Sequence, residues 1–313
     1  MAKGNNYGLK TRDMTKAGKF AMNAAAREGD TAYSTAATVG DRWQIFAAYA
    51  KEEGLKRLEQ ITPQVVAAWG QTLAEQVKEA ELSPAYAQNL VSAVNSVMKH
   101  ATQGQWQRVS PTKDCGIDKR CAVRSAIPQG IERGDLHQAV EALRNTEQQR
   151  GAAVLLLARE LGLRVKEASL LDARTALKEA QQREVIRVTH GTKGGRPREI
   201  PVTSHTQREA LRVASEAQGT AKSLVPTQQN WAQWEAGGLR NARETLQQHG
   251  IGRVHELRAA YAWQRYQEIT GQPPRLGGGQ VSRAEDRAAR LTIARELGHG
   301  RVNVTVSYLG SMR

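Results

Sequence analysis

Residues 184–202 have the sequence EVIRVTHGTKGGRPREIPV. Apolar and polar residues alternate from Glu184 to Thr189, which is typical of a half-buried strand. Arg198 to Val202 supplies a second stretch of suitable length, and a glycine-rich turn around Lys193 separates the two. The stretch therefore predicts a short antiparallel hairpin.

Helical patterns flank this hairpin on both sides. Gly151 to Leu171 has strongly helical character with a break near Gly162, and the pattern after Ser204 is helical up to the C-terminus. We therefore expect residues 132–313 to form an α+β domain that is mainly helical and contains a small antiparallel sheet.

Residues 31–110 contain helical signals, and no strand pattern precedes residue 125. An amphipathic helix is expected from Thr35 to Glu53. Two further helices are expected to begin at Thr62-Pro63 and at Ser83-Pro84, because each pair places a hydroxyl N-cap before a proline at the first helical position. The segment is therefore expected to be an all-α bundle.

Two polar segments complete the expected organisation. Residues 1–30 are predicted to form a basic arm with a helix from Asp13 to Arg27, and residues 111–131, rich in Gly, Pro, Ser, Lys and Arg, are predicted to form a linker. A basic linker between two basic domains is suited to closing around a duplex. An ordinary solvated loop explains its composition equally well.

The charge of the chain indicates a polyanionic partner. Its 313 residues carry a net charge of +14, with a pI near 10. Residues 1–125 have 17 basic and 12 acidic side chains, and residues 126–313 have 28 and 19. Both halves are therefore candidates to face phosphate. A merely soluble basic protein is the alternative on charge alone.

Neither a membrane partner nor a zinc site is expected. The longest apolar run, Ala152 to Ala158, is far shorter than the roughly 20 residues of a membrane span. Cys115 and Cys121 have no His or Cys partner at metal-ligand spacing. A reducing cytoplasm is the simplest location.

Four segments of the second domain carry candidate chemistry. They are LGLRVKE at 161–167, GTKGGR at 191–196, HELR at 255–258 and LGH at 297–299, and Tyr308 follows nine residues beyond the last. Each has an ordinary explanation when taken alone: a helix start, a solvated turn, a local pair on a helix face, and a packing tyrosine. Their occurrence together in one domain is what suggests a site.

Together these residue types suit phosphoryl transfer between DNA and protein. Arginines hold the non-bridging oxygens of a phosphodiester and stabilise the added charge of its transition state. A tyrosine attacks while cationic neighbours help it lose its proton, and a lysine on a hairpin protonates the leaving oxygen. Because no carboxylate cluster and no phosphate-binding loop is present, we expect no metal, no ATP and no other cofactor.

The four segments resemble the catalytic boxes of the tyrosine recombinases, the family of phage integrases and chromosome-dimer resolvases. The resemblance implies that Lys193 is the general acid and that Tyr308 is the nucleophile. It implies six catalytic residues and one supporting carboxylate: Arg164, Lys193, His255, Arg258, His299, Tyr308 and the supporting Glu167.

The resemblance also implies what the whole chain does. Residues 31–110 are similar in helical character to a SAM-like core-binding domain that clamps the other face of DNA. The implied enzyme cleaves and rejoins double-stranded DNA at specific recombination sites through a 3′-phosphotyrosyl intermediate, integrating or excising a mobile element. The resemblance also implies a homotetramer on DNA in the bacterial cytoplasm, associated with the nucleoid. It leaves open whether an accessory DNA-bending protein takes part. The alternatives are a type IB topoisomerase and a non-catalytic DNA-binding regulator on the same fold.

Three features depart from the family pattern. The stretch between Arg258 and His299 is long and includes a basic, Gly-rich segment from Gly277 to Arg290. A strand expected after Leu171 is hard to see in Ala173 to Gln182. Only five residues follow Tyr308, which puts the usual coupling of subunits through a tail helix in doubt.

Overall fold

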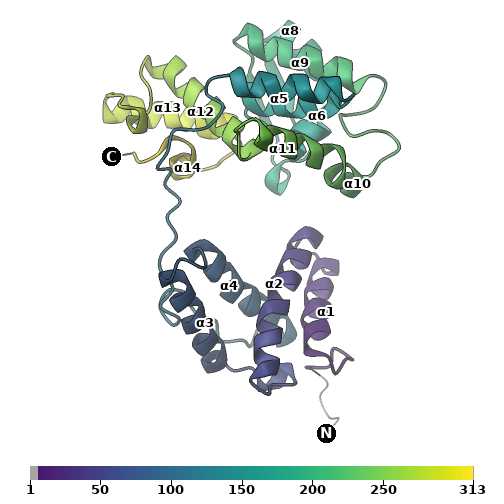
Figure 1. The fold of residues 1–313 in the computed structure, drawn as a ribbon, viewed down its shortest axis with the longest axis vertical. Helices are drawn as coiled ribbons and strands as arrows, with labels where there is room; N and C mark the ends of the chain where they lie inside the picture. The colour runs from purple at the N-terminus through teal and green to yellow at the C-terminus, as the bar shows by residue number, and fades with distance from the viewer. Residues whose placement is uncertain (1–5, 313) are drawn as a thin grey trace. The chain divides into compact units, whose positions relative to one another are not determined.

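The computed structural model describes residues 6–312, which divide into two compact units (Figure 1). Unit 1 extends to Cys121 and unit 2 begins at Ala122. No helix within the described residues is long and apolar enough to cross a membrane.

Unit 1 is helical throughout its described residues, as the sequence predicts. Thr62 and Ser83 accept hydrogen bonds from the backbone N–H groups of Val65 and Tyr86, so both predicted N-caps are confirmed. The elements of unit 1 are α1 (Met14–Arg27), α2 (Tyr33–Glu52), the short 3₁₀ helix η1 (Leu58–Gln60), α3 (Pro63–Lys78) and α4 (Pro84–Ala101).

Aromatic residues form the centre of unit 1. Trp43 and Phe46 of α2 are fully buried, and the ring of Phe46 lies edge-on to that of Trp69 on α3, with centroids 5.0 Å apart. The first helix packs closely against this cluster, since a Cβ on Gly18 would lie 2.1 Å from Nε1 of Trp43. Helix α1 is therefore part of the core of unit 1.

The chain after α4 returns to the same core. The side chain of Asn95 donates to the carbonyl oxygen of Val109 (2.8 Å) and accepts from its backbone N–H (2.9 Å). Cys115 and Ile117 are both buried, and a Cβ on Gly70 would lie 2.2 Å from Sγ of Cys115. The packed part of unit 1 thus continues as far as Ile117.

Unit 2 is mainly helical and contains one small sheet, which confirms the predicted fold class. Its elements are α5 (Gly134–Asn145), α6 (Gln149–Glu160), α7 (Val165–Leu170), α8 (Ala173–Arg183), β1 (Val185–Val188), η2 (Lys193–Gly195), β2 (Arg198–Pro201), α9 (His205–Gln218), α10 (Trp231–Ala236), α11 (Gly238–Gln248), α12 (Val254–Thr270), η3 (Arg275–Gly277), α13 (Arg283–Glu296), η4 (Val302–Thr305) and α14 (Val306–Leu309).

The predicted hairpin is confirmed as an antiparallel pair of β1 and β2. Ile186 lies opposite Ile200, and both side chains are fully buried. Val188 lies opposite Arg198. This register carries the turn with Lys193 to one end of the sheet and places Arg198 at the start of the returning strand.

The stretch from Ala173 to Gln182, in which the expected strand is hard to see in the sequence, is helical in the structure. Helix α8 begins at Ala173 because Asp172 caps it through the backbone N–H of Thr175, at 3.5 Å. Ala173, Ala176 and Ala180 recur at helical spacing and are buried. The sheet within the described residues therefore has two strands.

Helix α6 lies among α5, α9, α11 and α12, so most of its residues are buried (Figure 1). The predicted break after it is confirmed at Gly162, whose φ is +60°. A Cβ there would lie 2.4 Å from the ring of Tyr261, so this tight turn requires glycine. The turn delivers Arg164 to the start of α7.

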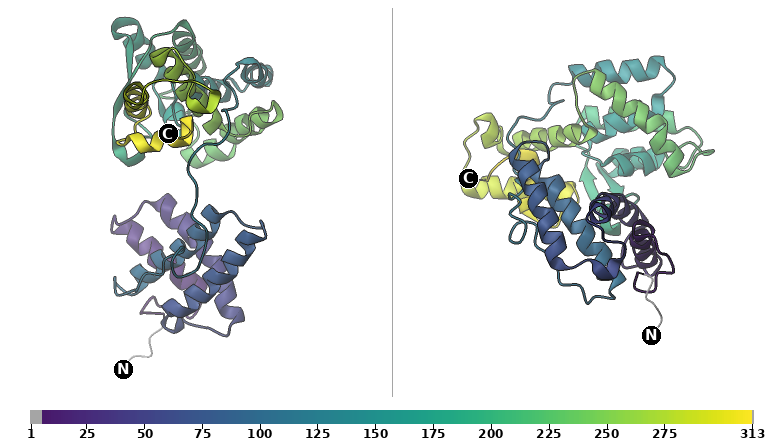
Figure 2. Two further views of the ribbon diagram at one scale, coloured as in Figure 1. Left: turned by 90° about the vertical axis from the view of Figure 1, so that its left-hand side faces the viewer. Right: turned by 60° about the horizontal axis from the view of Figure 1, so that its bottom comes forward.

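The C-terminal segment lies against helices of the same unit. Helix α14 packs on α12, and η4 packs on α13. Both views of Figure 2 show the end of the chain beside these yellow-green helices. This packing carries Tyr308 to the beginning of α12.

Candidate active site

Helix α12 provides two of the predicted residues. His255 and Arg258 are three positions apart and share one face of the helix. Arg258 is buried, and its guanidinium donates to the carbonyl oxygens of Gly162 and Leu297. It therefore joins the segment that precedes Arg164 to the segment that precedes His299.

Tyr308 of α14 lies within this arrangement. Its hydroxyl oxygen accepts a hydrogen bond from Nε of Arg258 at 3.2 Å and lies 3.1 Å from Nε2 of His299. Its ring stacks on that of His255, with centroids 5.2 Å apart and an interplanar angle of 17°. The structure thus brings four of the predicted residues into direct contact.

Glu167 holds the predicted first arginine. Its carboxylate accepts hydrogen bonds from the backbone N–H and from Nη1 of Arg164, each at 2.7 Å. Glu167 is fully buried, whereas the side chain of Arg164 is 24% exposed. Nη1 of Arg258 lies 3.9 Å from the same carboxylate. Glu167 therefore fixes Arg164 while part of the Arg164 side chain stays exposed.

Arg198, which the sequence places only at the start of the second predicted strand, also lies in the site. Its two terminal nitrogens donate to both carboxylate oxygens of Glu167, at 2.8 and 2.7 Å, and its side chain is 6% exposed. Its Nε donates to the carbonyl oxygen of Glu296 at 2.7 Å. Its direct neighbours Pro197 and Glu199 are exposed, so the local sequence carries no signal of its burial.

Glu296 supports the segment that carries His299. Its carboxylate accepts from the hydroxyl of Tyr261 at 2.8 Å and from Nε and Nη2 of Arg265 at 3.1 and 3.0 Å. Burial and the adjacent Glu296 raise the pKa of Tyr261, so this phenol stays protonated as a donor. The end of α13 is thereby tied to α12.

The electrostatic environment favours an ionised Glu167 and neutral histidines. Burial alone would raise the pKa of Glu167, but hydrogen bonds and positive charge from Arg198 and Arg164 lower it to about 2. Burial and the charge of Arg258 lower the pKa of His255. Burial, followed by the charges of Arg258 and Arg164, lowers the pKa of His299 to about 4.

Lys193 lies apart from these contacts. It is exposed in the turn between β1 and β2, and none of the hydrogen bonds or ion pairs described for residues 6–312 joins it to Tyr308 or Arg258. The turn is anchored at its start, because a Cβ on Gly191 would lie 2.8 Å from the carbonyl oxygen of Lys166. Its role as general acid remains a prediction.

The first residues of unit 2 also contact the site. The backbone N–H of Arg124 donates to the carbonyl oxygen of Val306 at 2.9 Å, and its guanidinium forms an ion pair with Glu256. The backbone N–H of Gln129 donates to the same carboxylate at 3.2 Å. This segment therefore binds both α12 and the helix that carries Tyr308.

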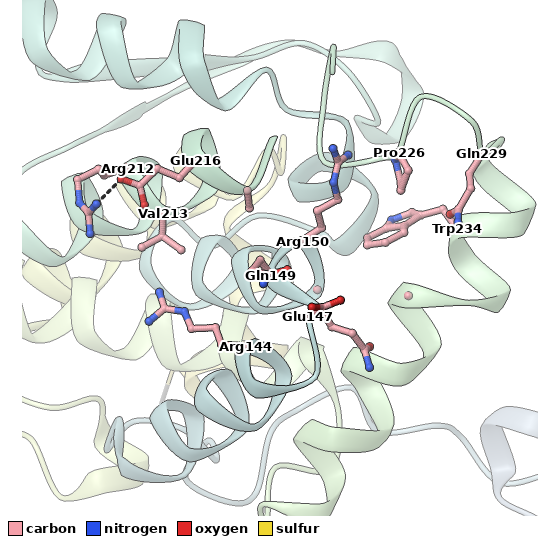
Figure 3. Close-up of a pocket in the computed structure, with 14 residues that line it drawn as sticks. Arg144, Glu147, Gln149, Arg150, Arg212, Val213, Glu216, Pro226, Gln229 and Trp234 are labelled. Carbon is pink, nitrogen blue, oxygen red and sulfur yellow. Dashed lines mark hydrogen bonds and ion pairs between the residues drawn. The ribbon is translucent and has the colours of Figure 1, made fainter. Parts of the chain in front are cut away.

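A separate pocket of about 790 Å³ opens beside α6, α9 and α10, and Figure 3 shows its lining residues. Val213 and Trp234 contribute apolar walls. Charged side chains of both signs also line it, namely Arg144, Arg150, Arg212, Glu147 and Glu216. The predicted site residues do not line this pocket, and its glutamates offset part of its positive charge.

No group of three or more His, Cys, Asp or Glu side chains is placed to hold a metal ion in the part of the chain from residue 6 to residue 312.

Comparison with known proteins finds a family match for part of the chain. The family model described as Integrase matches residues 120–264. No curated protein sequence matches the chain.

Solved structures share the fold over both units. An integrase of the Tn1549 transposon, in complex with transposon right end DNA, is 12% identical, covers 94% of this chain and 95% of its own, and has a TM-score of 0.58. The XerH site-specific recombinase, bound to a palindromic difH substrate, is 12% identical, covers 95% and 94%, and has a TM-score of 0.60. A lambda integrase tetramer bound to a Holliday junction is 16% identical, covers 95% and 77%, and has a TM-score of 0.58. The chain therefore shares an integrase match over most of unit 2 and has the fold of these recombinases over both units.

Proposed function

We propose that this protein is a site-specific DNA recombinase that cuts and rejoins strands through a covalent bond to Tyr308. The observation that carries the proposal is the position of the Tyr308 hydroxyl, 3.2 Å from Nε of Arg258 and 3.1 Å from Nε2 of His299. A buried phenol held between a guanidinium and an imidazole is placed to lose its proton while it attacks an electrophile. The proposed catalytic set is Arg164, Lys193, His255, Arg258, His299 and Tyr308, with Glu167 in support.

Two arginines supply positive charge for a bound phosphodiester. A guanidinium has five N–H donors. Those of Arg258 are partly used by Gly162, Leu297 and Tyr308, whereas Arg164 is more exposed and has its Nη1 bound to Glu167. The donors that remain on both can hold the non-bridging oxygens, which gain negative charge in the transition state.

The reaction balances without an external cofactor. The Tyr308 oxygen bonds to phosphorus while the bond from phosphorus to the 5′ oxygen breaks, which leaves a 3′-phosphotyrosyl link. The neutral imidazole of His299 accepts the phenolic proton, and Lys193 gives a proton to the departing 5′ oxygen. A 5′ hydroxyl that attacks the link in reverse rejoins the strand and frees Tyr308.

Double-stranded DNA is the proposed partner of both units. The net charge of +14 supports it, and so do the relatives of the same fold, which are described as complexes with DNA. Unit 1 would form the second contact surface on the duplex, and four copies would act together on two duplexes. Integration or excision of a mobile element in the bacterial cytoplasm, with or without an accessory DNA-bending protein, is the proposed setting.

A nicked suicide DNA tests this function. Loss of the short fragment beyond the cut prevents rejoining, so an enzyme of this kind accumulates as a covalent complex. Exchange between two differently labelled duplexes then identifies a recombinase, whereas relaxation of one duplex without exchange identifies a type IB topoisomerase. Binding without covalent attachment would indicate a regulator and contradict the proposal.

A further inference from the structure

The Gly-rich segment that precedes His299 is closely packed. A Cβ on Gly277 would lie 2.6 Å from the ring of Trp263, and one on Gly279 would lie 1.7 Å from the carbonyl oxygen of Pro273. These contacts fix the chain before α13 begins at Arg283. The segment therefore sets the position of α13 against α12. Helix α13 carries a buried arginine that has no part in the proposed chemistry.

That arginine, Arg290, is completely buried. Its Nε donates to both carboxylate oxygens of Asp286, at 2.9 and 3.0 Å. Asp286 in turn accepts from the hydroxyl of Tyr266 at 2.8 Å. A buried charge is costly unless it is paired and hydrogen-bonded. Asp286, itself held by Tyr266, supplies this pairing for Arg290 on the side that faces α12 and α13.

The other donors of Arg290 hold the segment around Tyr308. Nη1 donates to the carbonyl oxygen of Gly310 at 3.1 Å and Nη2 to that of Ser311 at 3.0 Å. Nη1 also lies 3.4 Å from Oγ1 of Thr305, which is buried. One guanidinium therefore contacts the chain on both sides of α14.

Helix α14 needs such support because it is only four residues long, Val306–Leu309. A helix this short is not stable by itself, so tertiary contacts decide where it lies. On one side Arg124 binds the carbonyl oxygen of Val306, and on the other Arg290 binds the residues that follow the helix.

We propose that Arg290 is a positioning residue for the nucleophile, holding α14 so that the Tyr308 hydroxyl stays within reach of Arg258 and His299. The inference rests on the proposed function of Tyr308. Within residues 6–312, the described contacts of Arg290 are with Asp286 and with the chain on either side of α14. Arg290 therefore acts on Tyr308 by fixing the position of this helix.

A double variant, Asp286→Asn with Arg290→Gln, tests the proposal without leaving an unpaired buried charge. Cleavage by a saturating amount of protein should slow by about 10²-fold, because a small displacement of a reacting group has a cost of this size. DNA affinity should stay close to that of the unaltered protein. Arg290→Lys should be intermediate, since an ammonium can still donate to the carbonyl oxygens. Arg287→Gln, an exposed change on the same helix, is the matched control.

Hydrogen exchange, measured without DNA, supplies a second readout. Exchange in the double variant should accelerate in peptides that cover 302–312 and stay unchanged in peptides from α6 and the beginning of α12. Normal cleavage by the double variant would overturn the proposal, and so would acceleration throughout unit 2. Failure of the proposed function itself is distinguishable, because the unaltered protein would then form no adduct on Tyr308.

Discussion

The hydroxyl of Tyr308 and Nε2 of His299 lie 3.1 Å apart although the two residues are nine positions apart along the chain. The intervening residues form η4 and the first part of α14, which bring the chain back toward α12. Arg258 contacts both side chains, at 3.2 Å from the hydroxyl and 3.5 Å from the imidazole. Loss of any one of the three therefore changes the surroundings of the other two.

Replacement of either proposed phosphate-binding arginine should impair cleavage far more than binding. Arg164→Ala and Arg258→Ala each remove charge that stabilises the transition state, and we expect rates at saturating protein to fall by about 10²–10³-fold or more. Arg212→Ala, which removes an exposed arginine paired with Glu209, serves as the control. Cleavage by either variant at the unaltered rate would remove that arginine from the site.

The lowered pKa of His299 predicts a pH-dependent contribution to stability. The folded protein binds this proton with a pKa of about 4, below the ordinary value of about 6.5. The contribution of His299 to the stability of the folded state is therefore complete above pH 6.5 and is lost as the pH falls through 4.

His299→Gln removes this titration. Between pH 7 and pH 4 the free energy of unfolding of the unaltered protein should fall by up to about 3 kcal/mol more than that of the variant, as measured by urea denaturation. His137→Gln, at an exposed position, should behave like the unaltered protein. Parallel curves for the unaltered protein and His299→Gln would show that His299 is not desolvated in the folded state.

The hairpin and the segments that meet at the candidate site could be predicted from the sequence because their signals are local. Alternation gives the strands, and Gly162, His255 and Arg258 lie within short recognisable segments. The burial of Arg198 could not be predicted, since it depends on a carboxylate 31 positions away in Glu167.

The same reason explains two further features that the sequence did not reveal. Arg290 belongs to a basic, Gly-rich segment, and this composition gives no sign of a buried arginine that donates to the carbonyl oxygen of Gly310. The helix within residues 1–30 was predicted, but its burial was not. Small residues such as Ala17 and Gly18 give little hydrophobic signal even though they allow the close approach of α1 to Trp43.

Lys193 should act at the leaving oxygen. Lys193→Ala should cleave ordinary DNA more slowly by about 10²-fold or more, within the usual contribution of general acid catalysis. A bridging 5′ sulfur at the scissile position leaves without a proton, so on that substrate the variant should approach the unaltered rate. Arg196→Ala, in the same exposed turn, should show no such rescue. An equally large defect on both substrates would leave Lys193 as a positioning contact.

DNA affinity should fall steeply with salt because both units are expected to neutralise phosphates. The logarithm of the binding constant falls with the logarithm of salt concentration in proportion to the number of phosphates neutralised. Residues 122–313 alone should therefore give a shallower slope than the whole chain in a titration by fluorescence anisotropy. Identical slopes would mean that unit 1 makes no contact with DNA.

The most direct measurement of the central claim is the identity of the residue that becomes linked to DNA. The protein is incubated with a nicked suicide DNA, digested with nuclease and protease, and analysed by mass spectrometry for a nucleotide-bearing peptide. The account predicts that the unaltered protein carries the adduct on Tyr308. It also predicts that Tyr308→Phe, which removes one hydroxyl and no charge, forms none while binding DNA with nearly the same affinity. An adduct on another residue, or an adduct that persists in Tyr308→Phe, would contradict it.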